Sequence, residues 1–464
     1  MQTKPTTIPL FLLAAASAAF ALTTPCRAAD APPADPNDWH KPAWLSELSV
    51  SAKAIYDDNL LGVSGKQLAP EKSQVSSVSL KLALNLLPLL GEQKTIKTLS
   101  LVYQPDAFSY SDYAAESYSS QKINTVIGGK TGDISFNFDN AFLYVDGSNQ
   151  APTYALNQLA GAAAEQNDKF RNNFAHAPAR ERRNQVQDRY TAQLTYTSGN
   201  YFVRAASALV FYNLQTVFHN TGAAPYKGYQ NYADRSDING GLDFGYKVTP
   251  DLALTLGYRD GYQYQQQFAA AISGDRHYSS NHYQRYLLGV EGKLAKWLTV
   301  KVAGGPDARD YNPNTPINHL RTTRFYGEGS LTAALPHSQT LAISYKQWLF
   351  LGSTGIAPYE DISYGLTYRW NPSKVWGLEL GLKALEANYT IGNDLAGSAP
   401  ALRDDLDYQE SIALTYSFTP HLIVNAGFTY EKGSNGLKSL AATFGPGFRD
   451  FEHMLTSVGL QYKF

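Results

Sequence analysis

Apolar and polar residues alternate along most of this chain with a period of two. The final segment, residues 452–464, shows the pattern clearly, because one face carries Met454, Thr456, Val458, Leu460, Tyr462 and Phe464. The opposite face is mostly small or polar. Successive side chains of a β-strand point to opposite faces, so strict alternation indicates a strand with different surroundings on its two sides. A chain dominated by such segments is predicted to be all-β.

The connections between the alternating segments differ in length in a regular way. Short turns are predicted at residues 131–132, 198–200, 248–251, 371–374 and 419–421. Longer polar segments lie between them, near residues 57–74, 147–184, 217–232, 267–279, 311–320, 391–404 and 432–450. Bacterial outer-membrane barrels join their strands by short periplasmic turns and longer extracellular loops, whereas a soluble sandwich has no reason for this asymmetry.

The predicted fold is therefore a closed antiparallel transmembrane β-barrel of about 18 strands, with 16 as the alternative. An even count places both ends of the barrel on the periplasmic side. The strand count depends on residues 103–130, where Pro105 makes the pattern least regular. Beyond the N-terminal segment no run of about 18 apolar residues occurs, which excludes a helical membrane protein. A soluble secreted β-protein is the competing class.

The N-terminal segment is typical of a secretory signal peptide. Lys4 precedes an apolar stretch over residues 9–22, and Cys26 and Ala28 are the small residues that a cleavage site requires. We predict a signal peptide over residues 1–28, a Pro-rich periplasmic linker over 29–44 and the barrel over 45–464. Cys26 is the single cysteine, so the mature chain would form no disulfide. The predicted location is the outer membrane of a Gram-negative bacterium.

The composition limits the partners that such a chain could have. The formal net charge of −1 gives no support for nucleic-acid binding, which requires a basic domain. Trp297, Trp370 and Trp376 lie beside short turns, as aromatic rings do at a membrane interface. We expect contacts with outer-membrane lipid and lipopolysaccharide, no metal and no cofactor. The sequence does not decide between a monomer and a homo-oligomer.

The longest polar segment, residues 147–184, is the candidate for a loop that narrows the lumen. The arginines in and after this segment are Arg171, Arg180, Arg182, Arg183 and Arg189. Such a cluster in the lumen would select anions, whereas on a surface loop it would contact water or lipopolysaccharide phosphates. The strand faces opposite the apolar ones supply further lumen-lining candidates, namely Arg204, Arg259, Lys301, Arg309, Arg324 and Arg369. Cations exceed acids on these faces, which predicts a mildly positive interior.

Catalytic patterns in the sequence are weak. Asp275, Arg276 and His277 occur together in a predicted loop, with Ser279 nearby. A hydrolase would need a nucleophile and a base held side by side, and charged residues on a solvated loop are the simpler interpretation. We therefore expect a protein that is not an enzyme.

Two short segments resemble known outer-membrane proteins. The last strand resembles the closing strand of Gram-negative barrels, which implies that Tyr462 and Phe464 are part of the signal read by the barrel-assembly machinery. Residues 56–61, Tyr-Asp-Asp-Asn-Leu-Leu, resemble a signature of the β-barrel porin 2 family, some members of which accompany exopolysaccharide systems. Physically, Asp and Asn suit turn-like hydrogen bonding where a strand leaves the sheet.

A porin-like barrel implies passive diffusion of small hydrophilic, and on the charge argument anionic, solutes. The alternative is an outer-membrane barrel that is accessory to exopolysaccharide export or secretion. An outer-membrane hydrolase and a purely structural or adhesive barrel are the remaining classes.

Overall fold

The computed structural model describes most of the chain after residue 40. The described residues are 41–60, 70–92, 94–146, 185–213, 234–266, 279–313, 315, 319–351, 358–389, 404–435 and 450–464. The chain divides into two units, Met1–Ala43 and Trp44–Phe464, and every strand among the described residues belongs to the second unit. The predicted signal peptide, most of the predicted linker and the predicted constriction loop lie outside the described residues.

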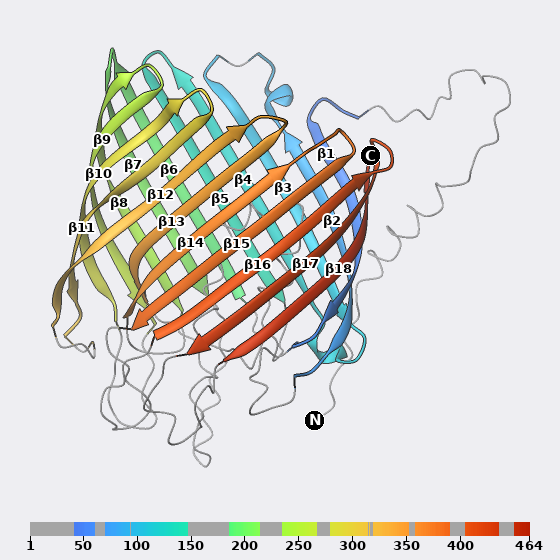
Figure 1. The fold of residues 1–464 in the computed structure, drawn as a ribbon. Coiled ribbons are helices and arrows are strands. Elements are labelled where there is room, and N and C mark those ends of the chain that lie inside the picture. Colours follow the sequence, from blue (N-terminus) through green and yellow to red (C-terminus); the bar gives the residue numbers. More distant parts are fainter. Residues whose placement is uncertain are drawn as a thin grey trace. The chain divides into compact units, whose positions relative to one another are not determined.

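Eighteen β-strands follow one another along the described chain, with two short 3₁₀ helices in connections (Figure 1). Their bounds are β1 Leu45–Asp57, β2 Ser73–Asn85, η1 Leu87–Leu90, β3 Ile96–Tyr110, η2 Ala114–Glu116, β4 Tyr118–Thr131, β5 Ile134–Asp146, β6 Gln185–Ser198, β7 Tyr201–Asn213, β8 Arg235–Thr249, β9 Leu252–Gln265, β10 Asn281–Ala295, β11 Leu298–Tyr311, β12 Arg321–Leu335, β13 Gln339–Leu351, β14 Pro358–Trp370, β15 Trp376–Tyr389, β16 Asp404–Ser417, β17 Leu422–Asn435 and β18 Phe451–Lys463. Neither helix is long and apolar enough to cross a membrane.

Each strand pairs antiparallel with its neighbours in sequence, and β1 pairs with β18 to close the sheet (Figure 1). The closing register runs from Ser49 opposite Lys463 to Asp57 opposite Leu455. Closure matters because backbone N–H and C=O groups in lipid must find partners within the protein. The prediction of 18 strands is confirmed, and the alternative of 16 is wrong.

Pro105 lies in the middle of β3, which explains the irregular sequence pattern there. The β2–β3 register includes Ser79 opposite Asp106 and Leu82 opposite Tyr103, but no pair at Gln104 or Pro105. Proline has no N–H to give to the ladder, so the pairing is interrupted at this point. The chain nevertheless continues as one strand of 15 residues.

The two faces of the strands differ as the alternation predicts. On β18, Met454, Val458 and Leu460 are exposed on the outside, while Leu455 and Ser457 on the other face are buried. The same division holds on the other strands, where exposed large apolar side chains lie on the outer face. An outer face of this kind is suited to lipid.

Polar and aromatic residues limit this apolar outer face at its two ends. Exposed ion pairs lie near the long-loop end, namely Asp260–His282, Asp310–Arg321 and Lys432–Glu452. Trp297, Trp370 and Trp376 are exposed beside short turns at the other end, as predicted. Aromatic rings prefer the interface between lipid and water. The chain is therefore an outer-membrane β-barrel with its short turns on the periplasmic side.

The C-terminal residue joins the seam of the barrel at the periplasmic rim. The backbone N–H of Phe464 donates to the carbonyl of Leu48 at 2.9 Å, and its ring meets that of Tyr462 edge to face at 5.0 Å. One backbone bond and one ring pair contribute little to a barrel of this size. A strong effect of losing Phe464 would therefore point to recognition during assembly.

Deletion of Phe464 is expected to lower the amount of folded protein in the outer membrane several-fold. The matched control, Phe464→Tyr, keeps an aromatic terminus and should retain nearly normal levels. Quantitative immunoblots of membrane fractions measure both. Normal levels of the deletion variant would count against the assembly signal.

Candidate functional site

The lumen-facing side chains on β7 to β10 form a first cluster of ion pairs. Arg204 on β7 donates to Asp243 on β8 at 2.8 Å and to both carboxylate oxygens of Glu291 on β10 at 2.9 and 3.0 Å. Arg259 on β9 donates twice to Asp243, at 2.6 and 3.0 Å. These strands bring the four residues together because each occupies an inward position of its own strand.

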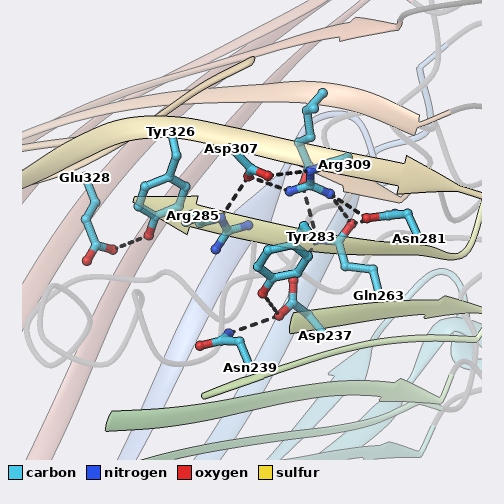
Figure 2. A network of polar contacts seen from close by, with 11 residues as sticks. Asp237, Asn239, Gln263, Asn281, Tyr283, Arg285, Asp307, Arg309, Tyr326 and Glu328 are labelled. Atoms are coloured by element: carbon cyan, nitrogen blue, oxygen red, sulfur yellow. Dashed lines mark hydrogen bonds and ion pairs between the residues drawn. The ribbon is translucent and has the colours of Figure 1, made fainter. Parts of the chain in front are cut away.

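A second, more deeply buried network is centred on Asp307 of β11 (Figure 2). Its carboxylate accepts hydrogen bonds from Arg285 Nε at 2.8 Å and from Arg309 Nε and Nη2 at 3.0 and 2.9 Å. All three residues are almost completely buried. Two cations thus share one buried anion, so the remaining positive charge must be compensated by other polar groups.

Aromatic rings and amides provide that compensation. The Arg285 guanidinium lies between the rings of Tyr283 and Tyr326, with centroids at 4.0 and 4.3 Å. Arg309 donates to the side-chain oxygens of Gln263 at 2.7 Å and Asn281 at 3.1 Å. Ring faces and amide oxygens are both attractive to a cation in a low-dielectric environment.

The network continues across the inner wall of β8 to β12 (Figure 2). The Tyr283 hydroxyl donates to Asp237 at 2.7 Å, Gln263 donates to the same carboxylate at 2.6 Å, and Tyr326 donates to Glu328 at 2.8 Å. Five neighbouring strands are therefore cross-linked by side chains in addition to their backbone ladders. This section of the wall is expected to be rigid.

The outer end of β13 separates from β12 and turns into the lumen, whereas β14 stays paired with β15 as far as Tyr359. Pairing between β12 and β13 ends at Gly327 opposite Gln347, whereas pairing between β13 and β14 continues to Leu351 opposite Pro358. The carbonyl of Leu349 accepts a hydrogen bond from Gln263 at 3.1 Å, and that of Leu351 accepts one from Arg235 at 2.5 Å. Both donors are lumen-facing side chains, on β9 and β8 respectively.

An apolar cluster fills the space around this inward-turned end. Trp348 and Phe350 stack with ring centroids 4.3 Å apart, and Phe350 meets Tyr212 and Tyr359 edge to face. The buried members of the cluster are Tyr212, Leu287, Tyr326, Trp348, Phe350, Tyr359 and Ala387. They come from β7, β10 and β12 to β15, so the outer part of the lumen is narrowed here.

Sequence reasoning did not find this constriction. The available signal was the run Trp348-Leu349-Phe350-Leu351, because continuous apolar residues indicate a strand buried on both faces. Leu349 and Leu351 are indeed buried at 2 and 0 % exposure. The loop predicted to constrict the lumen, residues 147–184, lies outside the described residues, so its role stays a prediction.

The structure divides the predicted lumen-lining residues into two groups. Arg204, Arg259, Arg309 and Arg369 face inward and form ion pairs, the last with Glu379 at 2.9 Å. Lys301 and Arg324 lie opposite the inward-facing Glu291 and Asp307 and remain exposed. Arg189 on β6 lies opposite the inward-facing Ala141. Arg171, Arg180, Arg182 and Arg183 lie outside the described residues, and the roles of all these residues in selectivity stay predictions.

The Tyr-Asp-Asp-Asn segment has a clear structural role at the seam of the barrel. Asp57 Oδ1 accepts from the N–H of Asn59 at 3.1 Å, which is the expected turn-like bond. Asp58 and Asn59 also bond to the backbone of β18, at Met454 and Glu452. The segment therefore extends the β1–β18 contact beyond the last paired residue of β1.

A buried histidine joins the same seam. His453 Nε2 lies 2.8 Å from Asp57 Oδ1, and His453 Nδ1 lies 3.7 Å from Glu431 Oε2 on β17. All three side chains are nearly inaccessible. Asp57 thus contacts a side chain of β18, whereas Asp58 and Asn59 bond to the backbone of β18.

Within the described residues no group of three His, Cys, Asp or Glu could hold a metal ion. Asp275, Arg276 and His277 lie outside those residues. Ser279 is buried, and its N–H donates to Gln265 at 2.7 Å.

Comparison with known proteins gives no family. No protein-family model and no curated protein matches the chain, so membership of the β-barrel porin 2 family and an association with exopolysaccharide export are not confirmed. Solved structures similar to this chain include OccAB3 of Acinetobacter baumannii, with 11% identity, coverage of 90% of this chain and 99% of that one, and a TM-score of 0.40. The outer membrane protein opdK of Pseudomonas aeruginosa has 9% identity, coverage of 90% and 99%, and a TM-score of 0.38.

A further similar structure is a loop L8 deletion mutant of OmpT, an outer membrane protein of Vibrio cholerae. It has 11% identity, coverage of 90% of this chain and 98% of that one, and a TM-score of 0.33. These values are too low to assign a family, a solute or an oligomeric state.

Proposed function

We propose that this protein is an outer-membrane channel for passive diffusion of small hydrophilic solutes, with a preference for anions. The observation that carries the proposal is the exposure of lumen-facing cations. Lys301 and Arg324 occupy inward positions and are exposed. A side chain on the inside of a closed barrel is exposed to the water of the lumen, so these charges are accessible to a solute.

Many acids on the inner face are buried, and the partly exposed Glu291 and Glu379 pair with Arg204 and Arg369. Those that are buried include Asp57, Asp106, Asp237, Asp243, Asp307, Asp361, Asp407 and Glu431. Burial removes an acid from contact with a passing ion, and in several cases an arginine or lysine neutralises it. The charge presented to the solute is therefore more positive than the overall balance of charged residues. Charged side chains at a narrow part of a pore select ions of the opposite sign.

The inward-turned end of β13 supplies the size selection in this proposal. It lies on the extracellular side, where a solute would enter, while Lys301 lies near the periplasmic end of β11. Size selection would thus precede charge selection along the path. Liposome swelling with sugars of increasing size measures the limit, and no swelling with the smallest sugars would show that the barrel is plugged.

Charge reversal at the two exposed cations tests the anion preference. The double variant Lys301→Glu/Arg324→Glu is expected to lower the ratio of anion to cation permeability by about fivefold. This factor corresponds to roughly 1 kcal/mol, the interaction energy of two unit charges about 4 Å apart in water. Reversal potentials in planar bilayers under a salt gradient measure this ratio.

Arg321→Glu is the matched control for that experiment. Arg321 lies on β12, as Arg324 does, but it pairs with Asp310 on the outer face and is 88% exposed. Its reversal should leave the permeability ratio unchanged. A cation preference in the native channel, or equal effects of the two charge reversals, would overturn the proposal.

A further inference from the structure

The outer end of β13 has two possible sets of partners, and the structure shows one of them. Residues 348–351 lie in the lumen, held by Gln263 and Arg235 through the carbonyls of Leu349 and Leu351. The edge of β12 that would continue the wall, residues 321–326, pairs with β11 but with no other described strand. An unpaired strand edge is a template for further pairing.

The existing register specifies how that pairing would continue. It places Gly327 opposite Gln347 and Leu331 opposite Ile343. Each residue further towards the start of β12 is matched by one residue further along β13, so the extended register places Phe325 opposite Leu349. Leu349 would then face outward beside Phe325, which is exposed on the outer face, and Trp348 and Phe350 would face the lumen. The side-chain pattern of β13 therefore suits a wall strand as well as the observed inward position.

The inward position is maintained chiefly by Arg235. Its guanidinium donates to the Leu351 carbonyl and lies over the rings of Tyr212 and Phe350, with centroids at 4.9 and 4.6 Å. Arg235 belongs to β8, five strands away from β13 in the closed sheet. A hydrogen bond from a charged donor is stronger than one from a neutral donor, so the contribution of Arg235 should exceed that of Gln263.

We propose that the outer end of β13, residues 348–351, is a gate with two positions, and that Arg235 is the positioning residue that keeps it in the lumen. In the second position residues 348–351 pair with residues 323–326 of β12, and the lumen widens. The inward position has side-chain hydrogen bonds and buried apolar rings, whereas the second position has backbone hydrogen bonds to β12. The free energies of the two positions can therefore be similar. The effect on solute passage rests on the proposed channel function, but the exchange of partners does not.

Disulfide formation between Phe325→Cys and Leu349→Cys tests the exchange directly. Residues directly opposite in an antiparallel pair bring their Cβ atoms to about 4.5–5.5 Å, close enough for a disulfide after slight adjustment. Cys26 is the only cysteine of the chain and lies in the predicted signal peptide, so no native thiol would compete. We expect Arg235→Ala to increase the rate of this cross-link about tenfold, the factor for loss of one charge-assisted hydrogen bond.

Two controls separate release of the gate from general loosening of the barrel. The pair Leu331→Cys/Ile343→Cys lies in the part of the register that is already formed and should cross-link rapidly with or without Arg235. Arg369→Ala removes another lumen arginine, whose partner is Glu379, and should not change the 325–349 rate. If Arg235→Ala failed to fold, two milder variants would replace it, namely Arg235→Gln, which keeps a donor, and Gln263→Ala. Each should increase the rate of the 325–349 cross-link by a smaller factor.

The same variants in planar bilayers distinguish this inference from the channel proposal. Arg235→Ala should raise single-channel conductance, and oxidation of its 325–349 pair should fix the conductance at the higher value. Faster cross-linking in a protein without conductance would support the gate and contradict the channel. An unchanged 325–349 rate in Arg235→Ala, or an equal increase in Arg369→Ala, would overturn the gate.

Discussion

Asp307→Ala is expected to lower the free energy of unfolding of the barrel by about 3–5 kcal/mol, the usual cost of removing one partner from a buried ion pair. Asp307 is 1% exposed and accepts three hydrogen bonds from Arg285 and Arg309. Without it, two buried guanidinium groups would face each other with no common anion. Tyr283, Gln263 and Asn281 would remain in contact with them but carry no full negative charge.

Urea titration of the barrel in lipid vesicles measures this loss, with unheated electrophoresis to report the folded fraction. The matched control is Glu379→Ala, because its partner Arg369 is 37% exposed, and partly exposed pairs contribute about 0–1 kcal/mol. The triple variant Asp307→Leu/Arg285→Met/Arg309→Met removes all three charges together. It should recover most of the stability, since apolar replacements of a buried ionic group are often neutral.

Equal effects of Asp307→Ala and Glu379→Ala would contradict the central role of Asp307. A triple variant as unstable as Asp307→Ala would show that packing around the arginines, and not their charge, dominates.

Asp57→Ala is expected to have the second large effect, at the seam between β1 and β18. The substitution leaves His453 buried without its 2.8 Å partner and removes the acceptor for the N–H of Asn59. We expect a cost of about 3 kcal/mol, the lower end for breaking a buried pair, because Glu431 remains 3.7 Å from the imidazole. The first and last strands meet only on folding, so assembly should slow as well.

The control for the seam is Glu452→Ala on the same strand. Glu452 pairs with Lys432 on the outer face, where the two side chains are 61% and 42% exposed, and its loss should cost at most about 1 kcal/mol. Refolding into vesicles and urea titration give the rate and the stability of both variants. An Asp57→Ala barrel that refolds and unfolds like the native protein would contradict the prediction that the Asp57–His453 contact stabilises the seam.

The sequence predicted the wall of the barrel well because the alternation within each strand shows which side chains face inward and which face outward. A period of two is a local property, so the faces of β18, β8 and β9 follow from the residues of each strand alone. The connections added the direction of each strand, since turn residues and long polar segments alternate. Pro105 blurred one strand because a single residue without an N–H alters the pattern over its neighbours.

The lumen was predicted less completely. Candidate arginines such as Arg204, Arg309 and Arg324 face inward, but alternation does not show which of them are neutralised. Their roles in selectivity stay predictions. Arg204 and Glu291 are 87 residues apart in the chain, and their pairing depends on the register of three successive strand pairs. The gate at residues 348–351 was missed because continuous apolar residues are compatible both with a wall strand and with a buried inward segment.

The sequence alone therefore determined the fold class and the side of each strand that meets lipid, and it favoured 18 strands over 16. These depend on interactions between a residue and its immediate surroundings, lipid or water, which recur every second residue. The tertiary structure decided which charges stay exposed in the lumen, where β13 leaves the wall and how the seam is held. These depend on residues brought together by closure of the sheet, and closure fixes distances that no single strand contains.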